Sequence, residues 1–122
     1  MKTEYVILAI IFIHWVADFL LQSYGMATNK HKNNTVLAIH SLIYSFVFFL
    51  VGVFFFDIIQ VTLFFMVTFV FHFITDYFTS RINTKLYNQR KYYGFIGFFP
   101  MIGLDQVLHY AQLIICYDIL LK

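Results

Sequence analysis

The stretch IIQVTLFFMVTFVFHFITDYFTS, residues 58–80, decides the fold class of this chain. A helix that crosses the hydrocarbon core of a bilayer needs about 20 mostly apolar residues, and this stretch supplies them. Its only acidic residue, Asp76, and its only histidine, His72, lie toward its C-terminal end. The stretch therefore predicts a membrane-spanning helix.

Three further stretches have the same apolar character and a similar length. A polar segment, residues 27–34, follows the first of them, and a basic segment, residues 81–99, precedes the last. We therefore expect an all-α, integral membrane four-helix bundle that forms one domain, residues 1–122. Besides residues 58–80, the predicted spans are residues 5–24, 35–56 and 100–121.

The composition excludes several other classes of protein. Hydrophobic residues make up 61% and charged residues 11% of the chain, whereas soluble domains average about 45–50% and about 25%. Such a chain has too few polar residues to cover a soluble domain, and it is too aromatic to be disordered. One cysteine, Cys116, allows no internal disulfide. The net charge of +2 is too small to indicate nucleic-acid binding.

The distribution of basic residues predicts the orientation in the membrane. Cytoplasmic loops of membrane proteins carry an excess of lysine and arginine. The side of the predicted termini has only Lys2 and Lys122, so we expect both termini outside, in a multi-pass protein of the bacterial cytoplasmic membrane. A cleaved signal peptide at residues 5–24 is the alternative, but His14 and Asp18 interrupt its apolar run. The loops between spans hold Lys30, Lys32, Arg81, Lys85, Arg90 and Lys91.

Histidine and aspartate recur in pairs within the predicted spans. Ionisable groups at membrane depth are costly and usually functional. Residues four apart on a helix project from one face, so each pair presents both side chains together. His40 adds a further imidazole from the second span, and the predicted topology places all seven groups in the cytoplasmic half of the bundle. The three pairs are His14 with Asp18, His72 with Asp76, and Asp105 with His109.

This mixture of imidazoles and carboxylates predicts a metal site. It suits zinc, manganese or iron, with zinc and manganese preferred. Seven ligands exceed the four of a structural zinc site and could hold two ions, the arrangement used for phosphoester hydrolysis. We take Asp18, Asp76 and Asp105 as the candidate catalytic residues. The candidate metal ligands are His14, Asp18, His40, His72, Asp76, Asp105 and His109.

A substrate would bind beside this cluster. Arg81 and Lys85 follow the third span at headgroup level and could bind a phosphate group. Gln22 and Gln106 flank the pairs and are further candidates for substrate binding. The function predicted from these residues is metal-dependent hydrolysis of a phosphate ester or anhydride at the cytoplasmic membrane face, with a phosphorylated lipid or isoprenoid as substrate.

The motifs His14-x-x-x-Asp18-Phe-x-x-Gln22, His72-x-x-x-Asp76-Tyr and Asp105-Gln-x-x-His109 resemble those of small phage and bacterial membrane proteins of unknown function. The resemblance covers nearly the whole chain. That family is in turn distantly similar to membrane-bound metal-dependent hydrolases, which implies a hydrolytic activity without naming a substrate. The richness in Lys, Asn, Ile, Phe and Tyr is compatible with a phage or a low-GC bacterium.

Three alternatives stay open at this point. The cluster could be a structural polar network, or part of a path for ions or protons, since histidine and aspartate also build relays. The chain could also be a non-enzymatic phage membrane protein that acts on the host envelope. The spans leave little interior, which makes a homodimer a further expectation.

The orientation is testable with reporter fusions. We expect fusions at Lys32 and Lys91 to report a cytoplasmic location and a fusion at Lys122 to report an external one, because the basic residues gather in the loops. The opposite pattern would contradict this orientation and would place the cluster in the outer leaflet.

Overall fold

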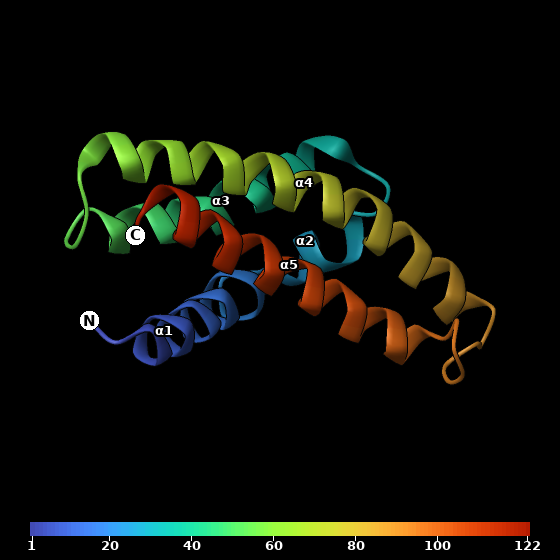
Figure 1. The fold of residues 1–122 in the computed structure, drawn as a ribbon. Helices are drawn as coiled ribbons and strands as arrows, with labels where there is room; N and C mark the ends of the chain where they lie inside the picture. Colours follow the sequence, from blue (N-terminus) through green and yellow to red (C-terminus); the bar gives the residue numbers. More distant parts are fainter.

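The computed structural model describes residues 1–122, and the chain is helical throughout, with no β-strand (Figure 1). The predicted all-α class is confirmed. The elements are α1 (Thr3–Trp15), the π-helix η1 (Val16–Leu20), α2 (Tyr24–Asn29), α3 (Asn34–Gly52), α4 (Ile58–Asn88) and α5 (Phe98–Leu120).

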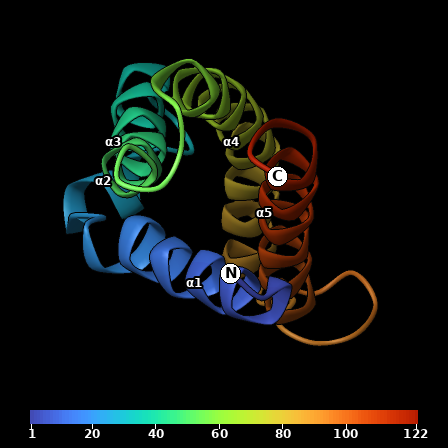
Figure 2. The same ribbon diagram turned by 60° about the vertical axis from the view of Figure 1, so that its left-hand side comes forward.

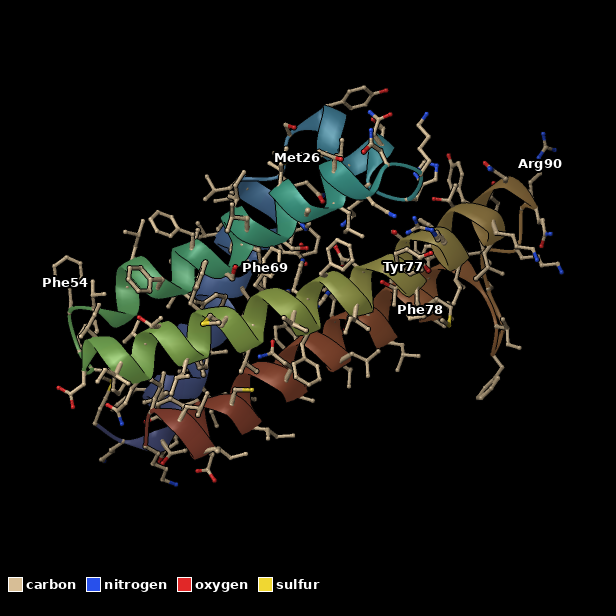
Figure 3. The ribbon with its side chains drawn as sticks, turned by 90° about the horizontal axis from the view of Figure 1, so that it is seen from above. Met26, Phe54, Phe69, Tyr77, Phe78 and Arg90 are labelled. Atoms are coloured by element: carbon tan, nitrogen blue, oxygen red, sulfur yellow. The ribbon has the colours of Figure 1, made fainter.

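Helices α1, α3, α4 and α5 are arranged around a common axis (Figure 2). Helix α4 packs against both α3 and α5, whereas α1 makes fewer contacts with α3 and α5. Both termini and the α3–α4 turn lie at one end, which we call the terminal end (Figure 1). Helix α2 and the α4–α5 connection lie toward the other, the loop end. Phe54 and Arg90 mark these two ends in Figure 3.

Three segments are long and apolar enough to cross a membrane: Thr3–Leu20, α3 and α4. Helix α5 has the length of a span, but Asp105, Gln106 and His109 interrupt its apolar run. The four-span prediction is therefore supported for three helices and not clearly for the fourth.

The distribution of side chains is that of a membrane protein. The buried side chains divide into ten hydrophobic and ten polar or charged residues. Large apolar residues such as Phe12, Phe71 and Phe78 point outward instead, and exposed apolar surface on this scale marks contact with lipid or another apolar partner. The hydrophobic core lies toward the terminal end, and the buried polar residues lie toward the loop end. The core residues are Val6, Ile10, Ala17, Tyr44, Phe48, Phe64 and Leu113.

Two segments predicted as loops are partly helical. Within the first, Ser23 accepts a hydrogen bond from the Met26 amide and caps the short helix α2. The predicted third span does not stop at Ser80, because no glycine or proline follows before Gly94, and α4 continues to Asn88. At 31 residues, α4 is roughly 46 Å long, which exceeds the hydrocarbon core of about 30 Å. The α4–α5 hairpin projects beyond α1 and α3 (Figure 1).

The turn into α5 depends on the absence of a side chain at Gly97. The Phe98 amide bonds to the Lys91 carbonyl at 2.8 Å, which folds the connection back on itself. A Cβ at Gly97 would lie 2.5 Å from the Tyr93 carbonyl oxygen, closer than packing allows. Gly103, within α5, has no atom within 4 Å of the corresponding position.

These two glycines should respond oppositely to the same substitution. We expect Gly97→Ala to lower the free energy of unfolding by about 1–3 kcal/mol, because the backbone must shift to relieve the overlap. Gly103→Ala should raise it by about 0.5–1 kcal/mol, because alanine is the better helix former. Thermal unfolding in detergent measures both, and equal effects would contradict the geometry of this turn.

Candidate metal centre

Helix α4 forms the frame of the site. Its buried residues recur every three or four positions and therefore lie on one face of the helix. This face is apolar near the terminal end and polar from Thr68 to Thr79, so the helix itself carries the change from core to site. The buried residues are Val61, Phe64, Thr68, His72, Asp76, Thr79 and Leu86.

The first helix changes geometry where it reaches this level. The Leu21 amide bonds to the Val16 carbonyl at 3.0 Å, five residues earlier, which is the hydrogen bond of a π-helix. Asp18 lies within this wide turn and is buried. His14 Nε2 still lies 3.6 Å from Asp18 Oδ2, but the other partners of the two side chains differ. Turns of this kind are frequent at functional sites.

Four side chains from three different helical segments converge into a first group: Asp18, His40, His72 and Asp76. The Nε2 atom of His40 lies 3.0 Å from Asp18 Oδ1 and 3.3 Å from Asp76 Oδ2. The Nε2 atom of His72 lies 3.7 and 3.3 Å from the same two oxygens, and 3.1 Å from His40 Nε2. Ligands about 2.0–2.1 Å from a tetrahedral zinc ion lie about 3.3–3.4 Å apart. The group therefore has the dimensions of a metal-binding tetrahedron.

The hydrogen-bonding pattern also fits a metal. Asp18 Oδ1 is buried and accepts no aligned hydrogen bond, although His40 Nε2 lies 3.0 Å away. A buried carboxylate oxygen this close to an imidazole nitrogen is in the arrangement that two ligands of one ion would have. The His72 ring is held by stacking on Tyr44 and on His109, at centroid distances of 3.7 and 4.3 Å.

A second group shares the Asp18 carboxylate with the first and is also contacted by Asp76. It consists of Asp18, Asp105 and His109. His109 Nε2 lies 3.3 Å from Asp105 Oδ1 and 3.1 Å from Asp76 Oδ1. Asp76 therefore directs Oδ2 to the first group and Oδ1 to the second. Carboxylates that contact two adjacent ligand groups are what a site for two ions requires.

Hydrogen bonds outside these groups hold the ligands in place. Thr79 donates to Asp105 Oδ1 at 2.6 Å, and the Gln106 amide donates to Asp105 Oδ2 at 3.1 Å. His14 lies outside both groups: Tyr44 Oη is 2.7 Å from its Nδ1, and Gln106 Oε1 is 2.6 Å from its Nε2. Six of the seven predicted ligands thus meet in the two groups, and His14 lies beside them. Such partners orient ligands and tune a metal site.

The residues predicted to bind substrate are dispersed. Arg81 donates to Asn34 Oδ1 at 2.8 Å and to the Tyr77 carbonyl at 2.9 Å, and it packs over the Tyr77 ring. Lys85 is exposed on α4. Gln22 follows the π-helix, and its buried Oε1 accepts no hydrogen bond. Gln106 contacts Asp105 and His14 and is therefore the one predicted substrate-binding residue that touches the predicted ligands.

Sequence reasoning missed Lys30 as a site residue. Its Nζ lies 2.9 Å from Asp76 Oδ2. In the sequence, Lys30 is only one of the basic residues in a loop that predict the orientation. Burial alone would lower the pKa of Lys30, but the nearby Asp76 and Asp18 carboxylates outweigh it and raise the pKa above its ordinary value. The ammonium is therefore charged at neutral pH. No pattern in the sequence distinguishes Lys30 from Lys32.

A polar cavity of about 240 Å³ leads to the cluster. It lies between the end of α2, the second half of α4 and the beginning of α5. Asp76 of the first group and Asp105 of the second are the two cluster carboxylates in its wall. A molecule in the cavity would therefore lie beside both ligand groups. Its other walls include Lys30, His31, Thr79, Ser80, Asn83, Tyr87, Phe98 and Ile102.

The sequence profile of a family described as proteins of unknown function, DUF3307, matches residues 6–122, and the chain belongs to this family. No curated protein and no solved structure matches the chain significantly.

The ligand geometry predicts which substitutions remove metal. We expect the purified protein to bind about one or two divalent ions per chain. Asp76→Asn should reduce the content most, because Asp76 contacts both groups, and Asp105→Asn should affect the second group alone. Elemental analysis after purification in detergent measures the content. Asp118→Asn is the control, because this exposed residue pairs only with Lys122 at the terminal end. Equal metal content in all three variants would contradict the site.

Proposed function

We propose that this member of the DUF3307 family is an integral membrane, metal-dependent hydrolase of phosphate esters or anhydrides, located at the cytoplasmic face of a bacterial inner membrane. One observation carries the proposal: two groups of potential ligands share Asp18, and Asp76 contacts both, at the end of a polar cavity.

The charges in the site favour an anionic substrate. Three aspartates and Lys30 leave two net negative charges when the histidines are neutral, and burying such charges is costly unless cations balance them. Two divalent ions, zinc or manganese by donor type, would reverse the balance to two net positive charges. Such a pair of ions supplies activation of water and neutralisation of charge on phosphoryl oxygens. Phosphate is an anion of the size and charge that this arrangement would hold.

The position of the cavity favours a membrane-associated substrate. The cavity lies at the loop end, where α4 continues past the length that crosses the hydrocarbon core. Its opening would therefore lie near the lipid headgroups. A phosphorylated lipid or isoprenoid could present its phosphate there while its chain stays in the bilayer.

The terminal half of the bundle argues against transport. Its interior is built from Val6, Ile10, Phe48, Phe64 and Leu113, which offer no ligand to an ion. The buried histidines and aspartates stop at the level of His14 and His72. An ion crossing the apolar layer would meet a barrier of several kcal/mol.

The proposal is tested by phosphate release in proteoliposomes. We expect the zinc- or manganese-loaded protein to release inorganic phosphate from vesicles that contain phosphatidate or a polyprenyl diphosphate. His72→Gln should abolish the release, because it removes an imidazole ligand while keeping a side chain of similar size. Gln112→Ala should retain it, because Gln112 hydrogen-bonds Thr68 outside both ligand groups.

The same vesicles separate the alternatives. Circular dichroism and thermal unfolding establish that both variants are folded. Proton or divalent-ion flux that disappears in His72→Gln, without phosphate release, would replace the hydrolase with a transporter. If the folded protein shows neither activity and binds no metal, the cluster is a structural polar network.

A further inference from the structure

Lys30 is the one lysine or arginine in the wall of the polar cavity. It follows α2, in the connection that leads to α3, and its side chain reaches across to α4. Only 16% of this side chain is exposed, an unusual position for a residue type that is almost never buried without a partner. The burial indicates a specific task at this site.

The Asp76 contact uses only part of the bonding capacity of Lys30. A lysine ammonium has three N–H donors, and the bond to Asp76 Oδ2 is the only one that Lys30 Nζ makes within the protein. The remaining N–H donors of the Lys30 ammonium lie beside the cavity and beside both ligand groups. A phosphoryl oxygen in the cavity would be a strong partner for them.

We propose that Lys30 binds the phosphoryl group of the substrate and that the cavity selects small phosphorylated headgroups. This inference rests on the proposed function and names the residue and the substrate class that serve it. In this arrangement Asp76 positions the ammonium, and the ammonium holds the phosphoryl oxygens against the site that Asp76 and Asp105 border.

The neighbouring lysines and arginine of the loop end, Lys32, Lys85 and Arg81, are not placed for this task. Arg81 is engaged by Asn34 and Tyr77. Lys32 and Lys85 are exposed and are absent from the cavity wall. The phosphate-binding task that the sequence assigns to Arg81 and Lys85 therefore falls to Lys30.

The dimensions and walls of the cavity define the substrate class. Its volume of about 240 Å³ lies below the range of about 300–1,000 Å³ that is usual for drug-sized ligands. It suits a phosphate or diphosphate group better than a whole nucleotide. Tyr87, Phe98 and Ile102 also line the cavity, and the first carbons of a hydrocarbon chain could lie against them.

Binding of inorganic phosphate to the manganese-loaded protein in detergent tests this role without relying on turnover. We expect Lys30→Ala to weaken the affinity measured by calorimetry at least about tenfold, because a charge-assisted contact is lost. Lys30→Arg should restore part of it, and Lys32→Ala should leave it unchanged although it removes the same charge two residues away. Manganese content should stay the same in all four proteins.

The outcomes separate this inference from the proposed function. Unchanged phosphate affinity in Lys30→Ala, or a loss of manganese that accounts for the whole change, would overturn the inference and leave Lys30 as a counter-ion of Asp76. Lys30-dependent phosphate binding without phosphate release from any vesicle would support the binding site and overturn the hydrolase. Competition by phosphatidate vesicles but not by phosphatidylcholine vesicles would support a lipid source of the phosphate, and equal competition by both would overturn the selectivity for phosphorylated headgroups.

Discussion

The burial of three carboxylates at one level of an apolar bundle is the constraint on which the rest of this structure depends. An isolated charge in such an interior costs several kcal/mol, and only close partners offset that cost. Asp18, Asp76 and Asp105 come from three different helical segments. Asp18 and Asp76 contact imidazoles from other segments, and Asp105 accepts a hydrogen bond from Thr79 of α4, so these contacts hold the helices together where the groups meet.

Local backbone geometry serves that convergence. The π-helix at Val16–Leu20 turns Asp18 toward His40 and His72, while His14 is held by Tyr44 and Gln106. One pair in the sequence therefore performs two tasks, with the aspartate among the ligands and the histidine beside them. The two side chains remain in contact, with His14 Nε2 3.6 Å from Asp18 Oδ2, so the histidine borders the ligand group without belonging to it.

The division of the interior into an apolar half and a polar half limits what the protein can do. A polar site that opens toward one end suits chemistry on a substrate that approaches from that membrane face. The short helix α2 matters here, because the connection after it brings Lys30 to Asp76 and closes one side of the cavity. The connection after this six-residue helix thus supplies Lys30, the one lysine or arginine in the cavity wall.

The sequence by itself determined the helical class, three segments long and apolar enough to span a membrane, and the gathering of histidine and aspartate at one level. Apolar length and i, i+4 spacing are local properties, and helical geometry converts them directly into position. Only the tertiary structure decided that Asp76 contacts both groups and that His14 lies outside them. It also decided that Lys30 points inward whereas Lys85 points outward. The direction of a long side chain and a local change of helix geometry both depend on neighbours from other segments. The spacing of residues along one helix gives no information about those neighbours.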